Sequence, residues 1–383
     1  MIKPHSSQSK SVLLICVNFN RDPDFNELVE EGIGLVEAAG YTVCDTITLN
    51  KTSVDPKFFV GRGKVDEIKT MSQALEVKNI IINHNLSSVQ ERNLELEFNL
   101  PVIDRTRLIL DIFAKRVTSN EGVLQVELSQ QTHQLSRLVR RWTHLERQKG
   151  GIGLRGGPGE KQIELDKRQI RDKIKSLKQR LSLAVKQRST QRKARFKNSV
   201  FSVSIVGYTN AGKSTLFNAL TKSNVYVKDQ LFATLQTTSR KLFIEDSREV
   251  VISDTVGFIR NLPHTLVASF KATLEETIHA DLLLHVVDVS QELRDRQIED
   301  VNKVLQEINA NNIPQLIIYN KIDLKPAIVP KIEYNHHNEP IAVYVSATDN
   351  LGLKLIHQAI IEKMDWQITN KTQDLAYEPW KYK

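Results

Sequence analysis

The sequence predicts an α/β protein made of three parts, and three patterns along its 383 residues support this fold class. Strand and helix signals alternate over residues 1–113, as in a small layered domain with mainly parallel strands. Amphipathic patterns of helical period then fill residues 114–197 and predict a helical hairpin, or coiled-coil arm. Strand signals near residues 200, 241, 250, 282, 315 and 341 predict a six-stranded doubly wound sheet over residues 198–364, and residues 365–383 are left as a carboxy-terminal tail.

The amino-terminal domain is expected to contain strands at residues 12–17, 41–49, 79–82 and 101–103, with helices at 26–39, 64–76 and 87–98. Gly61-Arg-Gly-Lys64 looks like part of a phosphate loop, but its spacing does not match that motif, and it is interpreted as a turn into a helix. ATP use through this domain stays open as an alternative. Cys16 and Cys44, the only two cysteines, lie in apolar strand-like runs and are expected to be buried, reduced thiols.

Two amphipathic helices are predicted in the central part of the chain. The first has apolar residues at helical spacing, and the second repeats them in near-heptad steps. The apolar stripe is expected to bury one helix against the other in an antiparallel hairpin. The stripe consists of Leu124, Leu128, Leu135, Leu138, Trp142 and Leu145 in the first helix and Ile163, Ile170, Ile174, Leu177, Leu181 and Val185 in the second.

The turn between these helices, residues 148–160, contains six of the 16 glycines in the chain. A tight turn needs only one or two glycines, because each extra glycine raises the entropy that is lost on ordering. The segment is either a flexible linker or a loop that lets the backbone approach RNA closely. In the second case Lys149, Arg155 and Lys161 are the candidate phosphate contacts.

Positive charge is concentrated in the arm. Residues 133–197 contain 20 Lys and Arg against 5 Asp and Glu, a net charge of +15, whereas the whole chain carries only +8. The other residues therefore carry −7, and the arm is predicted to bind a polyanion. Anionic lipid fits the charge as well as RNA does, so peripheral membrane contact stays open. Neither a signal peptide nor an apolar stretch of membrane-spanning length is recognised, and a cytoplasmic protein is expected.

Residues 207–214 match the phosphate-binding loop G-x-x-x-x-G-K-[ST]. A strand-like run, residues 200–206, precedes the loop and a helical run, residues 214–220, follows it, which is the context that this motif needs. We expect Lys213 to reach the β- and γ-phosphates of a nucleotide and Ser214 to bind Mg²⁺. The nucleotide contacts predicted from this loop are Gly207, Tyr208, Thr209, Asn210, Ala211, Gly212, Lys213 and Ser214.

Three further motifs follow strand-like runs. Asp254-Thr255-Val256-Gly257 supplies a carboxylate for Mg²⁺ and a backbone N–H for the γ-phosphate. Asn320-Lys321-Ile322-Asp323 selects guanine, because the Asp323 carboxylate can accept hydrogen bonds from guanine N1–H and the exocyclic amine, a pair of donors that adenine lacks. The backbone of Ser346-Ala347-Thr348 is expected to meet guanine O6. Four motifs in this order, each after a strand, predict a P-loop GTPase domain.

With these motifs in place, the chain resembles the HflX family of the Obg–HflX superfamily. Gln230-Leu-Phe-Ala-Thr-Leu-Gln236 looks like that family's first switch, and residues 150–160 closely resemble its glycine-rich signature. Val60-Gly-Arg-Gly-Lys64 is similar to a third family motif. The resemblance implies that Phe232, Ala233, Thr234, Leu235 and Gln236 lie at the nucleotide, and that Ser214, Thr234 and Asp254 hold Mg²⁺.

The resemblance covers nearly the whole chain and implies a cytoplasmic, Mg²⁺-dependent GTPase. It also implies binding to the 50S ribosomal subunit, to its 23S rRNA and to the 70S particle, with GTP-dependent splitting of stalled or idle ribosomes. A monomer is expected. Two other classes of function stay open: an RNA-remodelling protein in which GTP is structural, and a GTP-dependent regulator of a membrane or protein partner.

Two positions lead to hypotheses about turnover. Phe258 stands where Ras-like GTPases have a water-orienting glutamine, and the sequence identifies no other catalytic residue. Because phenylalanine has no polar group, hydrolysis is expected to be slow until a partner, another loop or a cation completes the site. Asn210 stands where potassium-activated GTPases have an asparagine that binds K⁺; a turn-stabilising role is the alternative.

Overall fold

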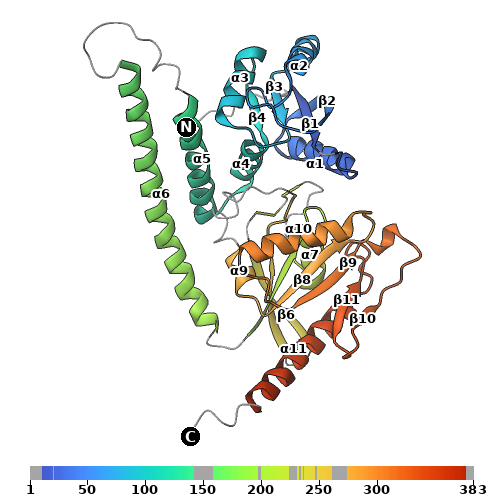
Figure 1. The fold of residues 1–383 in the computed structure, drawn as a ribbon. Helices are drawn as coiled ribbons and strands as arrows, with labels where there is room; N and C mark the ends of the chain where they lie inside the picture. Colours follow the sequence, from blue (N-terminus) through green and yellow to red (C-terminus); the bar gives the residue numbers. More distant parts are fainter. Residues whose placement is uncertain are drawn as a thin grey trace. The chain divides into compact units, whose positions relative to one another are not determined.

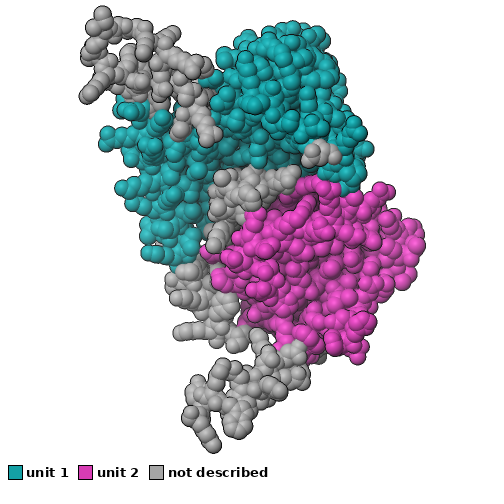
Figure 2. All heavy atoms as spheres, in the orientation of Figure 1, with its two compact units in different colours: residues 1–187 teal, residues 188–383 magenta. Residues whose placement is uncertain are grey.

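The computed structural model describes residues 11–19, 21–141, 158–196, 200–223, 231–232, 234–235, 237–245, 248–260 and 274–376. The chain divides into two compact units, residues 1–187 and residues 188–383 (Figure 2). The first unit contains the amino-terminal layer and most of the arm, and the second contains the phosphate loop. Each unit has a sheet of its own, and each is described by itself below.

The sheet of the first unit has four parallel strands in the order β2-β1-β3-β4 (Figure 1). The central strand β1 is apolar along most of its length, and its side chains from residue 12 to residue 17 are buried. The strands are β1 (Ser11–Phe19), β2 (Thr42–Lys51), β3 (Asn79–Ile82) and β4 (Val102–Asp104), and the helices of the layer are α1 (Phe25–Ala38), α2 (Arg62–Ala74), α3 (Ser88–Phe98) and α4 (Arg105–Arg116).

Helix α4 is missing from the elements predicted by sequence and continues across residue 113, where the predicted domain boundary lies. Its start is fixed locally, because the side chain of Asp104 accepts a hydrogen bond from the Arg107 backbone N–H at 2.9 Å. Its apolar face is buried at Leu108, Ile109, Ile112 and Phe113, at helical spacing. The helix therefore belongs to the core of the amino-terminal layer.

The two cysteines do not share one environment. Cys16 is buried in β1, as expected, and burial raises the pKa of its thiol to about 11. Cys44 is exposed, which corrects the prediction of a buried thiol. The register between β1 and β2 shifts at this point, so that Val43 and Asp45 pair with β1 while Cys44 does not. The sequence pattern cannot show such a bulge in an edge strand.

The arm begins with α5 (Asn120–Arg141) and continues in α6 (Pro158–Phe196), which runs beside α5 in the opposite direction (Figure 1). Helix α5 also packs on α3 and α4 of the layer. Lys173 of α6 pairs with Glu127 of α5 at 2.8 Å, and Leu124 and Leu177 are buried members of the predicted stripe. The segment 142–157 lies outside the described residues, and so do Lys149, Arg155 and the side chain of Lys161.

The sheet of the second unit has seven strands in the order β10-β11-β9-β8-β5-β7-β6, not the six predicted. The additional strand is β10 (Ile332–Tyr334), a three-residue edge strand antiparallel to β11, which is too short to give a sequence signal. The other strands are β5 (Phe201–Gly207), β6 (Thr238–Glu245), β7 (Arg248–Asp254), β8 (Leu282–Asp288), β9 (Gln315–Asn320) and β11 (Pro340–Tyr344). Strand β6 is antiparallel to β7, and the inner strands are parallel.

Helices cover both faces of this sheet, as a doubly wound fold requires. Side chains of α7 and α11 complete the core on one face, and side chains of α10 complete a second cluster with Phe258. From residue 200 onward, the helical elements among the described residues are α7 (Lys213–Thr221), α9 (Glu275–Ile278), α10 (Arg294–Glu307), the 3₁₀ turn η2 (Ile322–Leu324) and α11 (Leu353–Ala376). Among the helices of the described residues, none is both long and apolar enough to cross a bilayer.

Strand order places the phosphate loop. The chain runs from β5 to β7 on one side of β5 and then returns to β8 on its other side. The carboxyl end of β5 is therefore a topological switch point, where open α/β sheets bind ligands. The loop that follows Gly207 lies there.

Candidate active site

The phosphate loop connects β5 to α7 and depends on two glycines. Gly207 has φ +149, and a Cβ there would lie 2.2 Å from the carbonyl oxygen of Val286. Gly212 has φ +91, and its Cβ would lie 2.2 Å from Asn320 Nδ2. Only glycine fits either position. The backbone N–H groups at the start of α7 form, with this loop, an anion site of the kind that binds nucleotide phosphates.

Lys213, the first residue of α7, is held inside this loop. Its side chain is only 6% exposed, and its Nζ donates a hydrogen bond to the carbonyl oxygen of Tyr208 at 2.6 Å. Burial lowers the pKa of Lys213 to about 8, with the charge of Asp254 acting in the opposite direction. A phosphate in the loop would supply the negative charge that favours the protonated ammonium.

Three predicted Mg²⁺ ligands meet beside the loop. Ser214 Oγ lies 2.6 Å from Thr234 Oγ1 and donates to Asp254 Oδ2 at 2.8 Å. Asp254 is fully buried, and its second oxygen, Oδ1, makes no hydrogen bond within the described part of the chain. Burial raises the pKa of this carboxyl. A buried carboxylate with a free oxygen beside two hydroxyls fits a small divalent cation, because Mg²⁺ takes oxygen ligands.

The segment 254–258, which would be the second switch of a GTPase, is hydrogen-bonded to the phosphate loop. Thr209 N–H donates to the Phe258 carbonyl at 2.7 Å, and Phe258 N–H donates to the Gly207 carbonyl at 3.1 Å. Arg260 N–H donates to the Tyr208 hydroxyl at 2.8 Å. The ring of Phe258 is 1% exposed and lies in the core with Val206 and the residues of α10. The residue at the glutamine position therefore points into the core, away from the phosphates.

The guanine-selecting loop is tied to the phosphate loop by Asn320. Its Nδ2 donates to the Ala211 carbonyl at 3.0 Å, and its Oδ1 accepts from the Ala347 backbone N–H at 3.0 Å. Asp323 is exposed, and its Oδ1 accepts from Ser346 Oγ at 2.5 Å. Three separate motifs thus share one hydrogen-bonded scaffold, with the Asp323 carboxylate at its open edge.

Asp288 is a site residue that the sequence reasoning missed. Its Oδ2 pairs with Lys321 Nζ at 2.7 Å, and its Oδ1 accepts from Ser290 N–H at 2.9 Å and from Ser290 Oγ at 2.6 Å. Only 5% of the Asp288 side chain is exposed. A carboxylate at the end of the buried strand β8 was the available signal, because the carboxyl ends of parallel strands meet at one edge.

The remaining predicted contacts take different places. Phe232 and Leu235 are buried, Thr348 is exposed, and Asn210 is exposed with φ +63. Thr255 and Val256 are buried, and Thr255 Oγ1 donates to the Ile205 carbonyl at 2.5 Å. Ala233 and Gln236 lie outside the described residues. The predicted site is thus brought together at its phosphate, metal and base positions.

Comparison with known proteins agrees with this geometry. The family model described as "GTP-binding GTPase N-terminal" matches residues 26–114, "GTP-binding GTPase Middle Region" matches residues 116–195, and "50S ribosome-binding GTPase" matches residues 202–321. The GTPase HflX of Escherichia coli K12 is 48% identical over 95% of this chain and 85% of its own length. The chain belongs to the GTPase HflX family.

Other members of the HflX family match similarly. The protein of Caldanaerobacter subterraneus subsp. tengcongensis is 45% identical over 92% of this chain and 80% of its own length. Among solved structures, a GTP-binding protein from Sulfolobus solfataricus in complex with GDP is 25% identical, covers 94% of this chain and 99% of its own, and has a TM-score of 0.47. The chain is a P-loop GTPase, and its match to the GTPase family model spans residues 202–321.

Proposed function

We propose that this GTPase uses GTP and Mg²⁺ to control its association with the 50S ribosomal subunit and that the GTP form splits stalled or idle ribosomes. The observation that carries the nucleotide part is the meeting of Ser214, Thr234 and Asp254 beside the phosphate loop. Thr234 belongs to the first switch and Asp254 is the first residue of the second. One metal ion and one γ-phosphate would therefore order both segments together.

Within this site each group has a separate task. Ser214, Thr234 and Asp254 would hold Mg²⁺, whose charge stabilises negative charge on the transferred phosphoryl group. Lys213 and the backbone N–H groups of the loop bind phosphate oxygens, and Asp323 accepts from guanine. Phe258 supplies no polar group for the attacking water. The partner, or a K⁺ ion bound with the help of Asn210, is proposed to complete this last function.

The ribosomal part rests on the family match and on charge. The second unit matches the family described as "50S ribosome-binding GTPase". The arm carries the charge excess of +15 over residues 133–197, which suits the phosphates of 23S rRNA. Lys149, Arg155 and Lys161, in and beside the glycine-rich tip, are the proposed phosphate contacts.

The first test measures GTP turnover with and without purified 50S subunits, in K⁺ and in Na⁺, and pelleting with 50S under GTP analogue, GDP or no nucleotide. We expect stimulated turnover and the highest recovery with the analogue. Thr234→Ala should remove the difference between analogue and GDP. Equal recovery in all three states would contradict control by nucleotide.

The second test examines the arm. Lys149→Ala with Arg155→Ala should weaken 50S binding and lower the slope of its salt dependence by about two, one for each phosphate contact that is lost. Lys64→Ala with Lys69→Ala removes the same charge from the amino-terminal layer and is the matched control. Recovery on anionic vesicles that exceeds recovery on 50S would instead indicate a membrane partner.

A further inference from the structure

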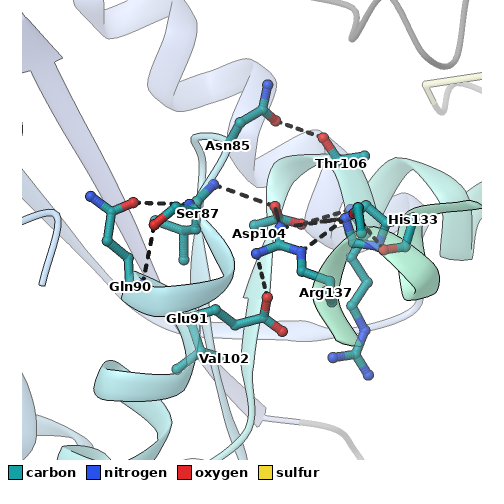
Figure 3. A network of polar contacts seen from close by, with 12 residues as sticks. Asn85, Ser87, Gln90, Glu91, Val102, Asp104, Thr106, His133 and Arg137 are labelled. Atoms are coloured by element: carbon teal, nitrogen blue, oxygen red, sulfur yellow. Dashed lines mark hydrogen bonds and ion pairs between the residues drawn. The ribbon is translucent and has the colours of Figure 1, made fainter. Parts of the chain in front are cut away.

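The amino-terminal sheet has a polar carboxyl edge, which is where an open α/β sheet holds its ligand. Two carboxylates lie there: Asp104 ends β4 and is 2% exposed, and Glu91 of α3 is 7% exposed. Two buried carboxylates are costly unless a cation pairs with them. That cation is Arg137, a residue of the arm helix α5 (Figure 3).

Arg137 binds both carboxylates with one guanidinium. Its Nη1 lies 2.5 Å from Glu91 Oε2, and its Nη2 donates to Asp104 Oδ2. The planar guanidinium presents its N–H groups in a fixed fork, which suits two acceptors placed side by side. His133, one turn earlier on α5, accepts a hydrogen bond from Arg137 Nε at 3.4 Å and lies 3.9 Å from Asp104 Oδ1. The side chain of Arg137 is only 12% exposed.

The layer itself supplies only part of the bonding of Asp104 in the contacts described. Asp104 accepts from the Arg107 and Leu86 backbone N–H groups, at 2.9 and 3.4 Å, but the layer offers it no cation in the contacts described. The neighbouring Arg105 is already engaged with Glu31 and with Asn83. Thr106 and Asn85 likewise bond to each other, at 2.7 Å. In the contacts described, the cation that pairs with Asp104 thus comes from the arm helix.

We propose that Arg137 is a positioning residue that docks the arm in the ligand edge of the amino-terminal sheet. In this arrangement α5 takes the place of a bound ligand, and the layer and the arm move as one body. The direction of α5 is set by Glu91 and Asp104. This proposal rests on the proposed function, because the arm matters only if it engages the ribosome.

The test compares Arg137→Met with Lys173→Met, which removes an exposed ion pair between α5 and α6 and leaves the dock intact. For Arg137→Met we expect at least tenfold faster hydrogen exchange over residues 124–138 and at least tenfold less stimulation of GTP turnover by 50S. Turnover without 50S and affinity for GDP should stay within twofold of the parent. Arg137→Lys should rescue only in part, since one ammonium does not span both carboxylates. Retained stimulation with unchanged α5 exchange in Arg137→Met would overturn the proposal.

If Arg137→Met fails to fold, Glu91→Gln provides a second test of the docking of α5. It leaves Arg137 paired with Asp104 and weakens only one side of the dock. We expect at least threefold faster α5 exchange and a matching loss of 50S stimulation; unchanged exchange would reject the dock. If the parent protein itself shows no 50S stimulation, the proposed function fails, whereas the exchange measurements still judge the docking of α5 separately.

Discussion

The two sheets of this molecule end in similar polar edges and use them differently. In the second unit, Asp254 keeps one oxygen without a hydrogen bond among the described residues, and glycines hold the loop open for phosphate. In the first unit, Asp104 is paired with Arg137, and Arg105 is paired with Glu31. Strand order creates the place for a ligand in both. Pairing within the chain decides whether the place remains available.

The two glycine–lysine turns show the same contrast locally. Lys64 follows the Gly61 cap of α2, and its Nζ pairs with Glu67 at 2.6 Å on the surface. Lys213 is enclosed by its loop and hydrogen-bonded to a backbone carbonyl. Lys64 therefore has a carboxylate partner on the surface, whereas Lys213 lies where a phosphate would bind. Two similar glycine–lysine sequences therefore stand in different chemical environments.

The largest effect is expected at Lys213, with Lys64 as its control. Lys213→Ala should reduce GTP turnover by about 100- to 1,000-fold, the cost of removing one preorganised donor from a charge-stabilising site. Lys64→Ala should leave turnover within twofold, because its pair with Glu67 is exposed. Steady-state phosphate release with GTP and with ATP measures both. ATP turnover that survives Lys213→Ala but not Lys64→Ala would show that the amino-terminal turn, and not the phosphate loop, is used for turnover.

A smaller effect is expected from acid, through His285 in the core of the second sheet. Burial lowers its pKa to about 4, and its Nδ1 faces Gln315 Oε1 at 3.3 Å. An unfolded histidine has a pKa of about 6.5, so between these values only the unfolded chain holds the proton. Stability is therefore full above pH 6.5 and falls as pH drops towards 4, by about 2 kcal/mol between pH 7 and pH 5.

His285→Gln should remove this part of the acid sensitivity, because glutamine does not titrate. Urea unfolding at pH 7 and pH 5 measures it in a background with Trp142→Phe and Trp380→Phe, where Trp366 alone reports on the second unit. Burial also lowers the pKa of His84 in the first unit. His84→Gln is thus the matched control, and we expect it to leave the Trp366 transition unchanged. Equal acid sensitivity of parent and His285→Gln would show that another group is responsible.

The smallest effect is expected at Asp288, which orders the Lys321 side chain at the nucleotide edge of the second sheet. Asp288→Asn keeps an acceptor for Ser290 but loses the charge that pairs with Lys321. We expect GDP to bind about tenfold more weakly, corresponding to about 1.4 kcal/mol, the scale of one charge-assisted hydrogen bond. Titration with a fluorescent GDP analogue measures this. Asp300→Asn breaks an exposed pair with Lys303 and should change the affinity less than twofold.

The nucleotide site could be predicted because its chemistry is local. Gly212, Lys213 and Ser214 are adjacent, and each motif follows its own strand, so the sequence alone places them at one sheet edge. The network around Arg137 could not be found in this way. Its partner Asp104 is 33 residues distant, and only the packing of α5 on α3 and α4 brings the two together. A lone basic residue on an amphipathic helix is normally solvated surface.

The errors in the predicted fold have similar physical causes. Helix α4 was missed because it starts with the polar run Arg105-Thr-Arg107 directly after β4, and its apolar face appears only from Leu108. Cys44 was expected to be buried, since a bulge that interrupts the alternation of β2 leaves no mark in residue type. Strand β10 has three residues and pairs only at the sheet edge. Each error involves an element whose form depends on its neighbours.

The packing of Phe258 limits how the rate of this enzyme can change. Its ring fills a position among Val206, Leu283 and Val301, while its backbone N–H and carbonyl are both bonded to the phosphate loop. A glutamine at this position would carry its amide into hydrocarbon, where an unpaired polar group is unfavourable by about 1–3 kcal/mol. Substitution alone would thus weaken the fold before it delivered a group to the water. Faster hydrolysis must therefore depend on a group other than this side chain. The rate of the reaction is then set by what the protein binds.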